Sequence, residues 1–341
     1  MMPLTLHESM VSRIKVLANM DISERRRSQD GSFSLKFGEK TVDFRVATVG
    51  MTWGEMMVVR ILDRSGGLVT LEDIGMDSAS LHTWRQLMTL PYGMLLVSGP
   101  TGSGKTTTLY ASIAELINSR GNIMSIEDPV EYRMDAINQI EVNRQAGITF
   151  ATGLRSIMRM DPNVILVGEI RDKETAHTAV DASLTGHLVL ASIHSNDAAS
   201  SIVRLLDLGT EPYLVATAVV GALAQRLVRK VCPHCGVPSD LTATEAMAYE
   251  QEMQEPVPQL PVGQGCNFCS NTGYLGRTGV FEVLTVSEPI RKLVAANASG
   301  QQIRAQALTQ GMVPLRRAGM LKAKAGVTTV GEVLRKAFFI D

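Results

Sequence analysis

The pattern of apolar and polar positions predicts a small sheet at the beginning of the chain. In residues 31–62, the runs FSLKF, TVDFRVATV and MMVVRIL alternate partially between apolar and polar side chains. Gly38, Gly50 and Gly54 interrupt them, as glycines do between strands. Residues 63–76 have the glycines and charges of a linker. The helix expected after this linker has one apolar face, made of Leu81, Trp84, Leu87 and Met88.

From residue 93 onward, short apolar runs alternate with longer helical stretches. The expected strands are GMLLVSG (93–99), NIMSI (122–126), NVILVG (163–168) and HLVLASI (187–193), and the expected helices are 104–118, 150–160 and 172–184. This order predicts an α/β fold with parallel crossover units, because parallel neighbours require a helix between them. Its chemistry is expected at the carboxyl ends of the strands.

The last third of the chain has a different character. After residue 231 the pattern is irregular and includes two cysteine pairs, and from residue 287 it predicts a series of helices. The expected domains are residues 1–72 as a partial N-terminal α+β domain with its linker, 73–231 as the core, 232–275 as a cysteine-containing insertion and 276–341 as a C-terminal helical region.

Composition and charge narrow the classes of protein. The 341 residues are 45% hydrophobic with a net charge of −1, which gives no bulk attraction to nucleic acid or to an anionic membrane. The longest apolar run, 215–224, has about half the roughly 20 residues that a membrane-spanning helix needs. The first residues lack a signal-peptide pattern, so a cytoplasmic location is expected.

The clearest motif is a phosphate-binding loop between a predicted strand and a predicted helix. GPTGSGKTTTLY matches G-x-x-x-x-G-K-[ST], so backbone N–H groups would surround phosphate oxygens. Lys105 would reach the outer phosphates, and the Thr106 hydroxyl would ligate Mg²⁺. The expected nucleotide-binding residues of this loop are Gly99, Pro100, Thr101, Gly102, Ser103, Gly104, Lys105, Thr106 and Thr107.

Carboxylates follow two of the predicted strands. In DPNVILVGEIRD, Glu169 lies one residue beyond the usual strand-terminal aspartate, and its longer side chain suits contact with Mg²⁺ through a coordinated water. In SIEDPVEY, Glu127, Asp128 and Glu131 follow the strand NIMSI, although a solvated turn would have the same composition. The general base is expected among Glu127 and Glu131, and spacing does not choose between them.

Two histidines flank the strand HLVLASI. His187 begins it and His194 ends it, so seven residues place them on opposite sides of a regular strand. Different roles are expected for the two, with a purely structural histidine as the alternative for either.

Two cysteine pairs predict a metal site. CPHC and CNFC contribute Cys232, Cys235, Cys266 and Cys269, the pattern of a closed tetrahedral zinc site that stabilises structure. A redox disulfide and unligated thiols are the alternatives. His234 lies within the first pair and is expected to be exposed rather than a ligand.

Taken together, these motifs resemble the type II secretion and type IV pilus assembly ATPases. The phosphate loop, the IEDPVE box, DPNVILVGEIRD and TGHLVLASIHSND occur in that family's order and approximate spacing, and the similarity covers nearly the whole chain. The resemblance implies a RecA-like P-loop core behind a PAS-like domain. It also points to the branch that carries the tetracysteine element and away from pilus-retraction motors.

The resemblance implies specific roles. Glu131 would polarise the attacking water, Glu169 would assist the metal, and His187 and His194 would couple the nucleotide state to the sheet. Arg45 and Arg60 would move onto the nucleotide when two domains close, whereas without the family they would be ordinary surface residues of strands.

Two features depart from the family pattern. The chain starts inside the family's first domain, without its upstream strand pair, which suggests a shortened form of a longer protein. Ser192 replaces a frequent threonine and keeps its hydroxyl group.

The expected function is a Mg²⁺-dependent ATPase motor in a ring of six identical chains. It would act at the cytoplasmic side of the inner membrane, on a secretion or pilus platform protein, without entering the bilayer or binding nucleic acid. Secretion and pilus assembly are not separable from these residues. The alternatives are a nucleic-acid motor or zinc-ribbon binding protein, which the low aromatic content disfavours, and a scaffold that binds nucleotide without hydrolysis.

Overall fold

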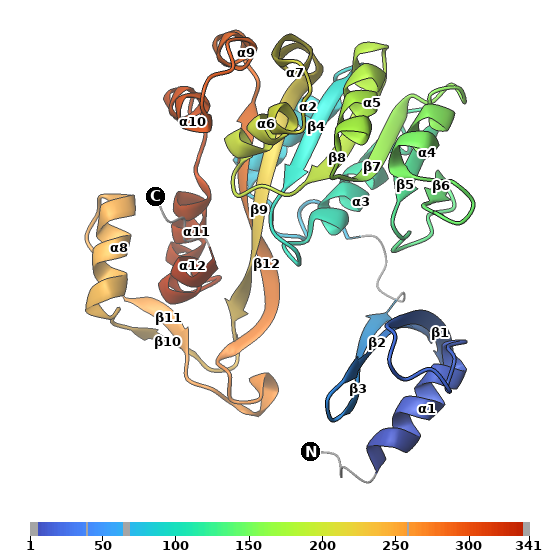
Figure 1. Cartoon of the computed structure of the whole chain (residues 1–341). Helices are drawn as coiled ribbons and strands as arrows, with labels where there is room; N and C mark the ends of the chain where they lie inside the picture. Colours follow the sequence, from blue (N-terminus) through green and yellow to red (C-terminus); the bar gives the residue numbers. More distant parts are fainter. Residues whose placement is uncertain (1–5, 39, 64–68, 258, 337–341) are drawn as a thin grey trace. The chain divides into compact units, whose positions relative to one another are not determined.

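The computed structural model describes residues 6–38, 40–63, 69–257 and 259–336 (Figure 1). The chain divides into two compact units, residues 1–68 and 69–341. Each unit has its own sheet and core, and each is presented by itself.

The first unit is an α+β domain. Helix α1 (His7–Leu17) packs on an antiparallel sheet of β1 (Gln29–Phe37), β2 (Lys40–Met51) and β3 (Gly54–Asp63) in the order β1-β2-β3. The small core between helix and sheet contains Ala18, Met20 and Val46. The strands agree with the alternation in the sequence, whereas α1 was not predicted.

The second unit is built on a seven-stranded sheet, in the order β12-β9-β4-β8-β7-β5-β6. All neighbours are parallel except β12 and β9, which are antiparallel. The strands are β4 (Gly93–Ser98), β5 (Ile123–Glu127), β6 (Asn138–Glu141), β7 (Val164–Ile170), β8 (Leu188–Ile193), β9 (Val219–Val231) and β12 (Tyr274–Thr285). The predicted parallel crossover units are therefore confirmed.

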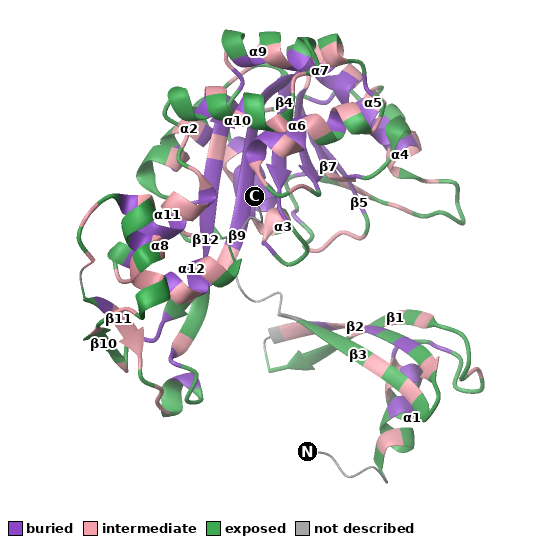
Figure 2. Cartoon of the chain, turned by 60° about the vertical axis from the view of Figure 1, so that its left-hand side comes forward, coloured by how far each residue is buried: buried purple, intermediate pink, exposed green. Residues whose placement is uncertain are grey.

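Helices cover both faces of this sheet. Side chains of α2 (Ser78–Met88) and α3 (Lys105–Leu116) share a core with Leu95 and Val97 of β4. Met94 and Leu96 point to the opposite core, with α4 (Phe150–Ile157), α5 (Lys173–Leu184), α6 (Ala198–Asp207) and α7 (Pro212–Ala218). Because both faces are covered, the central strands are continuous apolar runs and appear buried along their length (Figure 2).

The end of the chain differs from its prediction at one point. The four expected helices are present as α9 (Glu288–Ala295), α10 (Gly300–Thr309), α11 (Leu315–Lys324) and α12 (Val330–Lys336). The region predicted to be helical from residue 276, however, begins with most of β12, which extends the core sheet through its pairing with β9. The Glu282 carboxylate on β12 accepts the N–H groups of Ala198 and Leu315, the first residues of α6 and α11.

The cysteine-containing insertion is a small subdomain. It holds a two-stranded sheet of β10 (Gly236–Ser239) and β11 (Leu260–Gly263), helix α8 (Ala243–Met253) and the short helix η2 (Asn267–Cys269). Tyr249 and Met253 of α8 share a core with α11 and α12. No helix within the described residues is long and apolar enough to cross a membrane.

Candidate functional site

The loop between β4 and α3 has the geometry of a phosphate cradle. Gly99, Gly102 and Gly104 have φ values of +148°, +76° and +93°, which side chains other than glycine rarely adopt. A Cβ atom at Gly99 would lie 2.5 Å from Ser103 Oγ and 2.6 Å from the Gln225 carbonyl oxygen. Gly104 precedes α3 and supplies no capping side chain, so the first N–H groups of the helix are left for an external acceptor.

Lys105 is held across this loop. Its ammonium group donates to the carbonyl oxygens of Gly99 at 2.8 Å and Pro100 at 3.2 Å. Burial lowers the pKa of Lys105, and the positive charges of Arg226 and Arg171 add to this, while the Glu169 carboxylate opposes it. An anionic ligand would remove part of this penalty, because it would pair with the ammonium group.

Thr101, Gly102 and Thr106 are exposed at the same loop and helix start, and Thr107 is half-buried. The Ser103 hydroxyl is buried and has no hydrogen-bond partner among the described residues. A phosphate oxygen placed in this loop would supply the acceptor that the Ser103 hydroxyl needs.

Strand β9 supports the loop from a distant part of the sequence. The buried Gln225 side-chain amide donates to the Ser103 carbonyl oxygen at 2.7 Å. The neighbouring Arg226 guanidinium donates to the carbonyl oxygens of Gln225 at 3.0 Å and Asn196 at 2.8 Å. Neither residue was predicted as part of the site, since nothing in the local sequence connects β9 to the loop.

Glu169 is oriented by an irregularity in the sheet. The pairing of β7 with β8 shifts register between Val167 and Ile170, and the Ser192 hydroxyl donates to the Gly168 carbonyl oxygen at 2.5 Å in this gap. The Glu169 side chain is 13% exposed, and His194 Nε2 lies 2.7 Å from its Oε1. Arg171 pairs with the other carboxylate oxygen, which raises the pKa of the guanidinium.

The two candidate bases at and after the end of β5, Glu127 and Glu131, have different surroundings. The Glu127 carboxylate is buried and accepts hydrogen bonds from Tyr110, from Ser125 at 2.6 Å and from the Gln139 amide at 3.2 Å. Glu131 lies in the turn itself and is half-buried. Three donors therefore hold the Glu127 carboxylate inside the protein, and the choice of base between Glu127 and Glu131 stays a prediction.

The two histidines lie at opposite ends of β8, as the sequence indicated. His194 contacts Glu169 at the carboxyl end, whereas His187 precedes the strand. His187 Nδ1 lies 2.8 Å from the Ala182 carbonyl oxygen and 3.3 Å from the Thr185 hydroxyl. Within one chain, the structure therefore brings His194 into the site and leaves His187 outside it.

A pocket of about 730 Å³ opens beside the phosphate loop. Gly99, Pro100 and His194 line it, together with residues along α6 and from the first half of α10. Arg304 of α10 reaches across to Asp197, with a separation of 3.6 Å between guanidinium nitrogen and carboxylate oxygen.

Arg45 and Arg60 belong to the first unit. They are paired in register on β2 and β3, Arg45 half-buried and Arg60 exposed. Their expected approach to the nucleotide stays a prediction.

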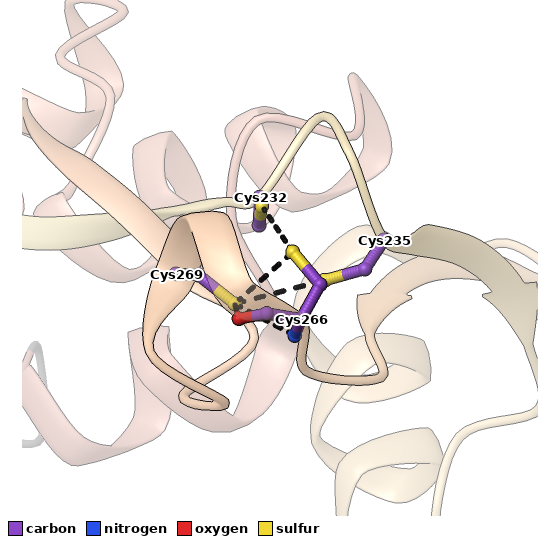
Figure 3. Close-up of side chains that lie close together, drawn as sticks. All are labelled: Cys232, Cys235, Cys266 and Cys269. Carbon is purple, nitrogen blue, oxygen red and sulfur yellow. Dashed lines mark hydrogen bonds between the residues drawn. The ribbon is translucent and has the colours of Figure 1, made fainter.

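The four cysteines converge as predicted (Figure 3). Their sulfur atoms all lie within 4.8 Å of one another, with 3.8 Å from Cys232 to Cys266, 3.8 Å from Cys235 to Cys269 and 3.7 Å from Cys266 to Cys269. This group could hold a metal ion.

The environment of Cys269 favours a metal-ligating thiolate. Desolvation by itself would raise its pKa, yet the backbone N–H groups of Cys266 and Gly273 donate to the sulfur and lower the pKa of Cys269, while burial and the neighbouring thiols raise the pKa of Cys235. His234 is exposed and stacks on Phe268 with 4.1 Å between ring centroids, so it is not one of the converging ligands.

Comparison with known proteins gives a consistent result. Residues 2–335 match the family model described as "Type II/IV secretion system protein". The type II secretion system protein HxcR of Pseudomonas aeruginosa is 46% identical over 97% of this chain and 66% of its own length. The type II secretion system ATPase E of Vibrio cholerae is 43% identical over 97% of this chain and 65% of its length. The type IV pilus assembly ATPase TfpB of Acinetobacter baylyi is 42% identical over 98% of this chain and 57% of its length.

Among solved structures, the pilus retraction motor PilT with bound ADP has a TM-score of 0.66 at 26% identity, covering 92% of this chain and 78% of that one. The ATPase DotB of Yersinia pseudotuberculosis has a TM-score of 0.68 at 21% identity, covering 96% and 81%. The expected RecA-like core is thereby supported. The chain spans between 57% and 66% of the length of the three sequence relatives above.

Proposed function

The chain belongs to the type II/IV secretion system protein family, and we propose that it is a Mg²⁺-dependent ATP hydrolase that powers type II secretion or type IV pilus assembly. The observation that carries the proposal is the glycine loop with its uncapped helix start, crossed by Lys105, at the same sheet edge as Glu169. The names of the relatives agree, since two of them are called ATPases of these systems.

The loop residues bind the phosphates of the nucleotide. The N–H groups of the loop and of the α3 start donate hydrogen bonds to the phosphate oxygens, and Lys105 leaves its carbonyl partners to pair with the outer phosphates. The Thr106 hydroxyl and the Glu169 carboxylate would hold Mg²⁺, since oxygen atoms are the ligands this ion prefers. When bound, Mg²⁺ neutralises negative charge that develops on the phosphates during hydrolysis.

We assign the hydrolytic step to Glu131, which orients and polarises the attacking water. Glu127 is less suited, because its carboxylate already accepts three hydrogen bonds inside the protein. His194 couples the nucleotide state to the sheet through its contact with Glu169. Arg45 and Arg60 supply positive charge to the transition state, and a well-placed arginine is worth about 10³ to 10⁵ in rate.

Zinc is the metal that we propose for the cysteine group. Four thiolates around Zn²⁺ have Zn–S bonds of about 2.3 Å, so the sulfur atoms of a regular tetrahedron are about 3.8 Å apart. Three of the six sulfur–sulfur separations, at 3.7 to 3.8 Å, fit this value, and all six are within 4.8 Å. The ion would join the loop after β9 to the loop before β12 and have a structural role.

We further propose that identical chains form a hexameric ring at the cytoplasmic face of the inner membrane, where a platform protein receives the motion. The family and two of the relatives are named for secretion and pilus assembly systems, which supports action within such a machinery.

Phosphate release, measured beside light scattering with and without an ATP analogue, tests the function. We expect Mg²⁺-dependent hydrolysis that Lys105→Ala abolishes, and a particle that approaches six chains with the analogue. Absence of hydrolysis from a verified ring would favour a nucleotide-binding scaffold, and strong stimulation by DNA would favour a nucleic-acid motor.

A further inference from the structure

Tyr110 connects the phosphate-loop helix to the acidic turn. It lies on α3, five residues beyond Lys105, and its side chain is buried. Its hydroxyl donates to the Glu127 carboxylate. The same oxygen accepts the backbone N–H groups of Glu131 at 3.3 Å and Tyr132 at 3.4 Å. This one phenol oxygen therefore acts as donor to Glu127 and as acceptor for two backbone N–H groups of the acidic turn.

Gln139 holds the same turn from the other side. Its side chain on β6 donates to the Glu127 carboxylate at 3.2 Å and to the Tyr132 carbonyl oxygen at 2.9 Å, and it accepts the Met134 N–H at 2.9 Å. The Tyr110 and Tyr132 rings also meet edge to face, with centroids 5.8 Å apart. The turn that carries Glu131 is thus fixed between α3 and β6, with Glu127 at the centre.

We propose that Tyr110 and Gln139 are positioning residues for ATP hydrolysis, which hold the backbone of Glu131 at a fixed place relative to the phosphate loop. The inference rests on the proposed role of Glu131 as the residue that orients water. Its physical basis is that α3 begins at the loop residue Lys105, so a bond from α3 to the turn sets the separation between bound phosphate and base. A base displaced by about 1 Å can lose 10²-fold in rate.

Tyr110 does not itself exchange a proton in this role. Burial raises the pKa of Tyr110, and its hydrogen bond to Glu127 raises it further, so the phenol stays protonated at neutral pH. Removal of the Tyr110 hydroxyl therefore removes hydrogen bonds that position the turn, and it does not remove a group that changes its protonation near neutral pH.

The test compares kinetics of the full chain in its assembled form. For Tyr110→Phe we expect kcat to fall by roughly 10- to 100-fold, with the KM for MgATP and the affinity for a non-hydrolysable analogue changed less than about twofold. Tyr213→Phe is the matched control, since Tyr213 on α7 is 65% exposed and should leave kcat unchanged.

A double-mutant cycle with Glu131→Gln separates positioning from a general structural effect. If Tyr110 acts only through Glu131, then Tyr110→Phe in the Glu131→Gln background causes no further loss in single-turnover phosphate release. Gln139→Leu provides a second, independent cycle with the same expectation, and it decides the matter should Tyr110→Phe fail to fold.

Multiplicative losses in these cycles, a wild-type kcat in the single variants, or an effect confined to KM would each overturn the inference. Failure of the proposed function has a different signature: the unmodified chain would release no phosphate, or Glu131→Gln would hydrolyse ATP like the unmodified chain.

Discussion

At the scale of single residues, the site depends on short polar contacts that orient carboxylates. Glu169 leaves the regular sheet where β7 and β8 shift register, and the Ser192 hydroxyl occupies that gap by donating to Gly168. A β-bulge commonly redirects a side chain next to a functional site. The contact of Glu169 with His194 then follows from the bulge rather than from regular strand geometry.

Replacement of Ser192 should expose this dependence. We expect Ser192→Ala to lower kcat by about 10-fold or more, because the Gly168 carbonyl group loses its donor and Glu169 is no longer held at one place. Ser192→Thr keeps the hydroxyl and should retain most activity. Steady-state phosphate release of both variants checks this, and equal activity of Ser192→Ala and the unmodified chain would contradict it.

At the scale of elements, an ion cluster secures the last helix. The buried Glu332 carboxylate on α12 pairs with Arg229 of β9 at 2.8 Å and with Arg335 at 2.7 Å. Burial by itself raises the pKa of Glu332, but these guanidinium groups outweigh it and the pKa is lowered. The cluster therefore favours the folded state while Glu332 is ionised.

Glu332→Gln should reduce the free energy of unfolding by about 1 to 3 kcal/mol at neutral pH, since charged hydrogen bonds are lost. A lowered folded-state pKa means that the contribution is complete above the ordinary glutamate range and disappears as the pH falls through the folded-state value. Urea unfolding at several pH values measures this. The exposed Glu250→Gln on α8 is the control, with an expected change within about 0.5 kcal/mol.

The cysteine-containing insertion should depend on its metal. We expect about one zinc ion per chain. Chelation of the zinc, or Cys266→Ser, should make residues 232–275 sensitive to protease while the core sheet remains folded. The reason is that zinc binding contributes roughly 10 to 16 kcal/mol to the folding of small peptides. Elemental analysis with limited proteolysis checks this. An unchanged cleavage pattern after complete removal of zinc would count against a structural metal.

The elements that could be predicted are those whose pattern is local. Strands β4 and β8 are continuous apolar runs because both of their faces are covered, and the phosphate loop is a contiguous motif. The secondary structure of the apolar run 215–224 could not be predicted in this way, because α7 ends at Ala218 and β9 begins at Val219 within the run. Gln225 could not be assigned either, because its partner Ser103 lies 122 positions away and only the sheet order brings them together.

At the scale of the whole molecule, the proposed catalytic residues come from two units. The second unit holds the phosphate loop, the acidic residues and the cysteine group, and the first unit holds Arg45 and Arg60. The carboxyl ends of β4, β5, β7 and β8 lie at one edge of the parallel sheet, which is why residues from distant segments form one site.

The proposed role of the first unit predicts a loss of rate on removal of one arginine. Arg60→Ala should lower kcat in the assembled oligomer by about 10³-fold, with assembly itself unchanged. The exposed Arg159→Ala, in the second unit, controls for loss of surface charge. Phosphate release with sizing of the same samples measures both effects, and an unaltered rate would exclude Arg60 from catalysis.

The most direct measurement of the central claim is the fate of ATP on Glu131→Gln. Purified variant is incubated with Mg²⁺ and ATP, freed of unbound nucleotide, denatured, and its bound nucleotide is identified by chromatography. We expect the Glu131→Gln variant to retain intact ATP, the unmodified chain to yield ADP, and Lys105→Ala to retain neither. Recovery of ADP from Glu131→Gln at the rate of the unmodified chain would contradict this expectation.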